Sequence, residues 1–195
     1  MFQLKRVAFA SLALVLAAVL SAEAQFGVPL NRTEPRLESA NARELVERYC
    51  RMDYAGTRLN PTDWPKLQPM VSWRSNPEFP LMMVTSRFDL DAEPTLEHGK
   101  YLISVHYRLL GKYDMAEGYS NESANKIQDV QFVVAEVNDD LQIIDIEPSY
   151  PHPSRAAVLQ WLNKKLADDQ DLASKTMYQH AVQDLQPPKP SPTPQ

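Results

Sequence analysis

Cysteine and glycine are both scarce in this sequence of 195 residues. The single cysteine, Cys50, rules out an intramolecular disulfide, so the fold depends on the burial of apolar side chains. Five glycines argue against glycine-rich phosphate-binding loops. Positive charge is also in deficit, because the formal net charge is −5 and no basic block is present. Nucleic acid is therefore not expected as a partner, since binding it requires neutralisation of several phosphates.

Recognisable metal-binding and cofactor-binding motifs are missing as well. The four histidines, His98, His106, His152 and His180, form no HxH or HExxH pattern, and one cysteine cannot supply a pair of thiolate ligands. The acidic cluster at 168–171 lacks the glycine and the spaced oxygen ligands of a calcium loop. We expect neither a metal nor a cofactor.

Long apolar runs are absent except at the N-terminus. Lys5 and Arg6 precede a 14-residue apolar run, 7–20, and Ala22-Glu23-Ala24 then fits the cleavage rule of signal peptidase. A membrane anchor, the alternative, needs about 20 apolar residues. The pattern predicts a signal peptide over residues 1–24 and a secreted or periplasmic product. No association with the membrane is expected after cleavage.

A helix and a connector are predicted next. Residues 25–40 have little pattern and are expected to form a loose lead-in. Asn41 and Glu44 match a capping box, and apolar residues then recur at three- and four-residue spacing, which indicates an amphipathic helix over 42–58. Five prolines between positions 61 and 80 exclude a long helix there. We expect a connector held to the core by its large apolar side chains.

Two-residue alternation predicts strands at 81–90, 101–110, 127–137 and 141–148. In the second of these, Tyr101 and Tyr107 share the apolar face, whereas His106 lies on the opposite face. The short connections make the strands antiparallel neighbours, and the polar stretch 111–125 is expected to be a loop.

After the sheet, Ser154 is expected to cap a helical region that reaches Leu185 across the acidic cluster. We favour two helices over one long helix. Residues 186–195 contain five prolines and are predicted to form an extended, disordered tail. Residues 41–185 therefore constitute a single α+β domain, in which an N-terminal helix packs on a four-stranded antiparallel sheet followed by one or two C-terminal helices.

This order of elements resembles the cystatin-like/NTF2-like superfamily over about residues 41–148. The segment ARELVERYCRMDYAGTRL and the W-x8-W spacing of Trp64 and Trp73 are similar to uncharacterised exported bacterial proteins. The resemblance implies a curved sheet that wraps the N-terminal helix. The enzymes of the superfamily usually place further helices before the sheet, and their pocket acid or base matches no position here. The resemblance therefore implies no activity.

Several side chains are candidates for a functional site. Asp53 could act as a general base on the helix, with a tyrosine as hydrogen-bond donor, or could pair with an arginine. His106 is a second catalytic candidate, alone or as the base for Cys50. Four aromatic residues could line an apolar ligand pocket or simply fill the core: Trp64, Trp73, Tyr101 and Tyr107.

These observations favour a secreted or periplasmic, non-catalytic module that binds a small ligand or a partner protein. One alternative is an NTF2-like isomerase, dehydratase or hydrolase that uses Asp53 and a tyrosine. Another is a structural cell-envelope protein whose proline-rich tail contacts a partner, because prolines lower the entropy that an extended segment loses on docking.

Overall fold

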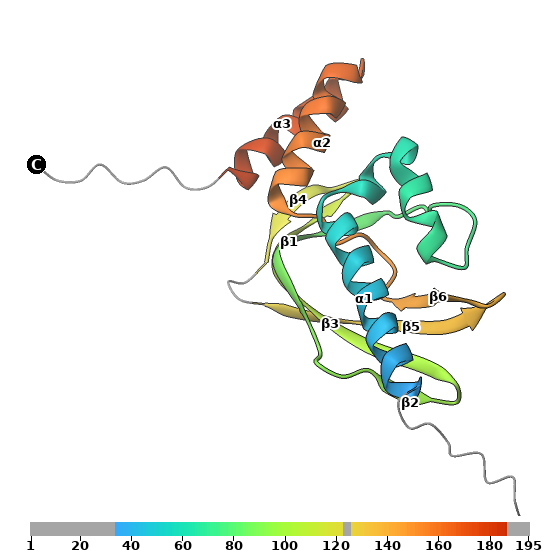
Figure 1. Cartoon of the computed structure of the whole chain (residues 1–195). Coiled ribbons are helices and arrows are strands. Elements are labelled where there is room, and N and C mark those ends of the chain that lie inside the picture. Colours follow the sequence, from blue (N-terminus) through green and yellow to red (C-terminus); the bar gives the residue numbers. More distant parts are fainter. Residues whose placement is uncertain (1–33, 123–125, 187–195) are drawn as a thin grey trace, which may run out of the picture. The chain divides into compact units, whose positions relative to one another are not determined.

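The computed structural model of the chain describes residues 34–122 and 126–186. The predicted signal peptide and residues 187–195 of the predicted tail lie outside the described residues. The chain divides at Glu34, and the fold below is that of the unit that begins at Pro35. It combines an antiparallel sheet with one N-terminal and two C-terminal helices, which confirms the predicted α+β class (Figure 1). Among the described residues, no helix is long and apolar enough to cross a membrane.

Helix α1 runs from Glu34 to Tyr54, so it begins inside the segment predicted as a loose lead-in. Asn41, the predicted cap, lies within the helix. The reason is that a proline is tolerated in the first helical turn, where its missing N–H has no partner to lose, so Pro35 does not block an earlier start. The helix ends four residues before the predicted Arg58, because Gly56 takes a left-handed φ of 88°.

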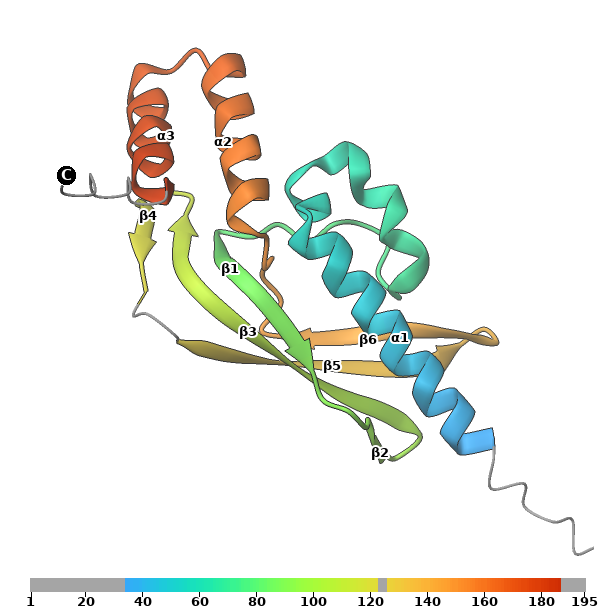
Figure 2. The same cartoon turned by 60° about the vertical axis from the view of Figure 1, so that its left-hand side comes forward.

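The apolar stripe of α1 lies across one face of the sheet (Figure 2). Tyr49 is 1 % exposed, and its ring meets that of Phe132 edge-on with centroids 5.7 Å apart. The residues of α1 that are buried in this first core cluster are Ala42, Leu45, Val46, Tyr49 and Cys50.

The proline-rich connector is tied to the same core, as predicted. It forms three short 3-10 helices, η1 (Thr57–Leu59), η2 (Pro61–Lys66) and η3 (Gln68–Met70), because its prolines prevent a longer α-helix. Trp64 and Leu67 are buried in the first core cluster. The connector therefore has fixed positions relative to α1.

Within residues 34–122 and 126–186 the sheet has six strands rather than the four predicted. The four expected strands lie in the order β1-β3-β5-β6, and the short β2 and β4 pair with β3. The end of β3 and the whole of β4 lie within residues 111–125, the polar stretch that was predicted as a loop. A Cβ on Gly111 would lie 2.5 Å from the carbonyl oxygen of Ser120, so the β3–β4 pairing requires glycine there. The strands are β1 (Leu81–Leu90), β2 (Thr95–Glu97), β3 (Lys100–Asp114), β4 (Gly118–Asn121), β5 (Ile127–Val137) and β6 (Asp140–Glu147).

Strand β3 presents the face that the alternation predicts. Tyr101 and Tyr107 are buried beneath α1, and His106 points to the opposite face. Phe88 of β1 lies opposite Tyr107 in the register, so the first core cluster continues across both strands.

Two C-terminal helices follow, α2 (Arg155–Asp168) and α3 (Leu172–Leu185). The favoured prediction of two helices is confirmed. The second helix begins after Asp171 because that side chain caps α3, accepting a hydrogen bond from the Ser174 N–H at 2.7 Å. The helices cover the end of the sheet where β1 begins (Figure 2). There they form a second core cluster, whose buried members are Leu59, Met82, Val84, Tyr113, Val158, Leu162, Ala181 and Leu185.

Candidate functional site

The four aromatic pocket candidates lie in or against the first core cluster. Tyr101 and Tyr107 are 6 % and 1 % exposed, and Trp64 is 7 % exposed. The Tyr107 hydroxyl donates to Sγ of Cys50 at 3.1 Å, and the Trp64 indole donates to the carbonyl of Arg74 at 3.1 Å. None of the four, Trp73 included, lines the grooves described below. The structure accounts for them as core residues.

Asp53 is buried within the fold, at 2 % exposure. Its Oδ2 accepts a hydrogen bond from the backbone N–H of His152 at 2.9 Å. Burial raises the pKa of the Asp53 carboxyl, and the charge of Arg58 opposes this shift. Arg58 is itself 3 % exposed and shares the interior with Asp53, near enough for its charge to act on the carboxyl.

His152 completes this buried polar cluster, and sequence reasoning missed it. Its ring stacks on Tyr107 with centroids 4.1 Å apart. Burial lowers the pKa of His152 to about 3, so the imidazole is neutral near pH 7. The flanking prolines, Pro151 and Pro153, were the one local sign of a constrained segment. Their carbonyls accept hydrogen bonds from the backbone of β1, which places His152 inside.

The cluster contains groups that act as acids, bases or nucleophiles elsewhere, but they are sealed from solvent. Cys50 is 0 % exposed, and burial raises the pKa of its thiol, which keeps it protonated. A general base must come within hydrogen-bond reach of the proton that it removes. Asp53 therefore ties α1 to the segment after β6 through the backbone of His152, and Cys50 ties α1 to β3 through the hydroxyl of Tyr107.

His106 lies on the exposed face of the sheet between two carboxylates. Its Nδ1 is 2.7 Å from Oδ1 of Asp129, and its Nε2 is 2.9 Å from Oδ1 of Asp91. These hydrogen bonds raise the pKa of His106. The carboxylates lie at opposite edges of the ring and do not converge on one point. Accordingly, the described residues contain no group of three His, Cys, Asp or Glu placed to hold a metal.

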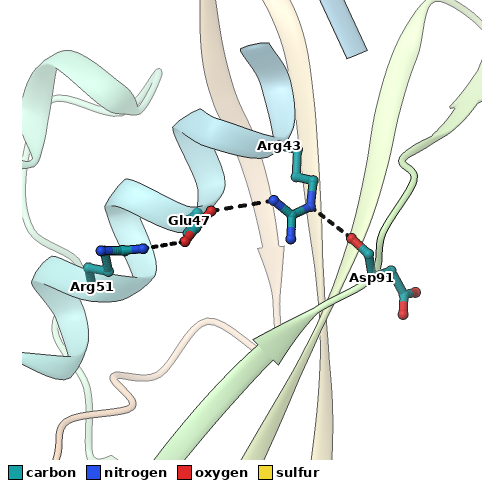
Figure 3. Close-up of polar contacts among 4 residues, drawn as sticks. All are labelled: Arg43, Glu47, Arg51 and Asp91. Carbon is teal, nitrogen blue, oxygen red and sulfur yellow. Dashed lines mark hydrogen bonds and ion pairs between the residues drawn. The ribbon is translucent and has the colours of Figure 1, made fainter. Parts of the chain in front are cut away.

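Asp91 also connects the sheet to α1 (Figure 3). Its backbone carbonyl accepts a hydrogen bond from Nε of Arg43 at 3.0 Å. Glu47 bridges Arg43 and Arg51, one helical turn away on either side, at 3.4 and 2.5 Å. The two ion pairs and this hydrogen bond lie at the surface, and they hold the middle of α1 to the residue that follows β1.

The most ligand-like feature is a groove of about 640 Å³ between α2 and the η1–η2 turns, called the α2 groove here. One wall comes from residues between Ala55 and Lys66, and the other from residues between Ala157 and Asp168. Figure 2 shows these elements side by side. The walls meet at Gly56, where a Cβ would lie 2.9 Å from the Cβ of Ala157. Sequence reasoning missed the groove, because its walls are about a hundred residues apart in the chain.

Trp161 is the aromatic residue of the α2 groove. Its ring is half-buried and meets the rings of Tyr113 and Tyr178 edge-on, with centroids 5.6 and 6.3 Å apart. These two contacts fix the orientation of the indole before any ligand binds. The ammonium of Lys165 lies over the same ring, 5.6 Å from its centroid.

The charges in the α2 groove are mixed. Asp63 accepts hydrogen bonds from Lys66 at 2.5 Å and from Asn60 at 2.9 Å, and these lower the pKa of its carboxyl. Lys164 is near enough for its charge to lower that pKa further. Asp168 closes the far end of the wall formed by α2.

Two other hollows have fewer features of a ligand-binding site than the α2 groove. One of about 660 Å³ lies between the β3–β4 turn and α3, around Met177 and His180. The other, of about 350 Å³, includes Arg108 and Arg155, and the acidic Glu122 and Asp184 line the same space. Neither of these two contains a tryptophan.

No family model, no curated protein and no solved structure matches the chain.

Proposed function

We propose that this protein is an exported, non-catalytic module that binds a small ligand in the α2 groove. The observation that carries the proposal is the meeting of Trp161 with two lysines that form no ion pair with another described residue, Lys164 and Lys165, in a groove of about 640 Å³. Small-molecule sites typically measure roughly 300–1,000 Å³ and combine apolar surface with a few polar groups. Export rests on the N-terminal pattern of charge, apolar run and cleavage site.

The construction of the groove also supports a binding role. One wall is anchored beneath by Leu59, which is 6 % exposed, and the other by Val158 and Leu162, which are fully buried. A ligand would therefore meet walls that are already in place. Preorganised walls reduce the ordering cost of binding.

The positions of the residues considered as catalytic candidates support a binding role without catalysis. Asp53 and Cys50 lie in the interior, away from the α2 groove, and His106 is held by two carboxylates on the exposed face of the sheet. The NTF2-like resemblance remains a prediction. The alternative that relies on the proline-rich tail concerns residues outside those described.

The test is to fill the groove without disturbing the core. Gln160 is exposed and lines the groove, so Gln160→Trp places bulk where the ligand would lie. Gln179→Trp makes the same change on an exposed position of α3 and is the matched control. Both variants of the full mature chain are screened with a fragment library by amide NMR.

We expect fragments to shift amides of η1 and α2 in the wild type and in Gln179→Trp, and to lose at least about tenfold in affinity in Gln160→Trp. Fragments that bind elsewhere, or that bind Gln160→Trp as well as the wild type, would contradict the proposal.

A further inference from the structure

The ionisable side chains of the α2 groove fall into two sets: one ion pair, and three side chains that are in no ion pair with a described residue. Five such side chains line it, and two of them, Asp63 and Lys66, neutralise each other at 2.5 Å. Asn60 occupies the second carboxylate oxygen of Asp63. Asp63 therefore has little to offer a cationic ligand.

The remainder is Lys164, Lys165 and Asp168, which carry one net positive charge. Neither lysine is in an ion pair with another described residue. The whole chain has a net charge of −5, so the groove is a local exception. An anion that enters the groove meets two ammonium groups and one carboxylate, so the net attraction is for negative charge.

The position of Lys165 links this charge to the aromatic ring. Its ammonium lies over Trp161, and its side chain is exposed, so it can swing toward an incoming anion. The ring face that it leaves is then available to a flat group. The charge and the ring are close enough to be used by one small molecule, with its anionic group attached to a planar body.

The net charge of the α2 groove also limits which class of anion fits it. None of the arginines whose side chains the structure describes lines the α2 groove. Recognition of a phosphate chain commonly uses bidentate arginines or a nest of backbone N–H groups. One net positive charge is suited to a monoanion such as a carboxylate or a sulfonate.

We propose that the ligand of the α2 groove is a monoanion with a flat, aromatic or unsaturated body, which stacks on Trp161 and pairs with Lys164 and Lys165. This inference rests on the proposed function and adds the chemical class of the ligand.

The experiment uses three probes that share one ring and differ in charge: 2-naphthoate, 2-naphthylmethanol and 2-naphthylmethylammonium. Each is titrated into the full mature protein at pH 7 and low salt, and binding is followed by amide shifts in α2 and by the indole N–H of Trp161. We expect naphthoate to bind more tightly than the ammonium probe by roughly tenfold, with the alcohol between them.

Two variants locate the effect. The double variant Lys164→Gln, Lys165→Gln should bring naphthoate to the affinity of the alcohol and leave the alcohol unchanged. Lys175→Gln on α3 removes a lysine that does not line the groove, and it should preserve the preference for the anion.

The outcomes separate the two proposals. If the ammonium probe binds the groove as tightly as naphthoate, and Gln160→Trp blocks both, the charge class is wrong and the binding function stands. A preference for naphthoate that survives the double lysine substitution also overturns the charge class. If none of the three probes shifts the amides of the groove, the ligand class is wrong, and the fragment screen decides separately whether the groove binds a small molecule.

Discussion

His152 shows how burial sets the protonation state of a single side chain. Exclusion from water, together with the nearby charge of Arg58, lowers the pKa of His152 to about 3, from 6.5. In the unfolded chain the same side chain is free to take up a proton near pH 6.5. The unfolded state therefore binds more protons between these two pH values. The contribution of His152 to the stability of the folded protein is therefore present above pH 6.5 and is lost as the pH falls toward 3.

We predict that His152→Phe, which retains a ring on Tyr107, makes the protein less sensitive to acid. Between pH 6 and pH 4 the wild type should lose about 2 kcal/mol more than the variant, since one pKa unit is worth about 1.4 kcal/mol. The measurement is the free energy of urea unfolding at several pH values. The raised pKa of Asp53 has the opposite sign, but Asp53 is present in both proteins and largely cancels in the comparison.

His180→Phe is the control for this comparison, because His180 is exposed on α3. It should leave the acid sensitivity of the wild type unchanged. Parallel pH profiles for the wild type and His152→Phe would show that His152 is not buried as a neutral base.

At the scale of elements, Gly56 sets the distance between the end of α1 and α2. It has a φ of 88°, and a Cβ there would lie 2.9 Å from the Cβ of Ala157. We predict that Gly56→Ala costs about 2–4 kcal/mol, the sum of backbone strain and a steric contact that must be relieved by moving η1 away from α2. Thermal and urea unfolding measure the cost.

Gly99→Ala separates the two causes. Gly99 also has a positive φ, 74°, but nothing lies within 4 Å of a Cβ built there. Its substitution should cost about 1 kcal/mol, from backbone strain alone. Equal losses for the two variants would mean that the contact with Ala157 is unimportant.

The elements with strong local patterns were predictable from the sequence. The two-residue alternation of apolar side chains predicted β3 and its buried tyrosines. Their three- and four-residue spacing predicted most of α1. The burial of His152 was not predictable, because it follows from contacts with β1, 67 residues earlier, that no local pattern records. The α2 groove was missed for the same reason. Trp161 lies within the helical region predicted after Ser154, but its position beside η1 depends on the tertiary fold.

At the scale of the whole molecule, strand β1 joins the two core clusters. Met82 and Val84 belong to the cluster beneath α2 and α3, whereas Met83 belongs to the cluster beneath α1. Neighbouring residues of one strand thus contribute to both. We infer that the C-terminal helices and the sheet unfold together.

We predict that Leu162→Ala, at a fully buried position of α2, destabilises the protein by about 2–4 kcal/mol. Hydrogen exchange should show lower protection in α1 and β3 as well as in α2. Leu172→Ala, at a position 78 % exposed, should change stability by less than about 0.5 kcal/mol. Loss of protection confined to α2 and α3 would mean that the clusters unfold independently.

The segment after β6 has a consequence for the protein's behaviour at high concentration. It runs beside β1, where Met83 and Thr85 donate their N–H groups to the carbonyls of Pro151 and Pro153. At the other margin of the sheet, Ser72 donates to the carbonyl of Ile143 in β6. Exposed strand margins are where chains add to one another and aggregate. The proline-containing backbone beside Met83 and Thr85, and the connector beside Ile143, therefore make these parts of the two outer strands less open to the addition of another chain.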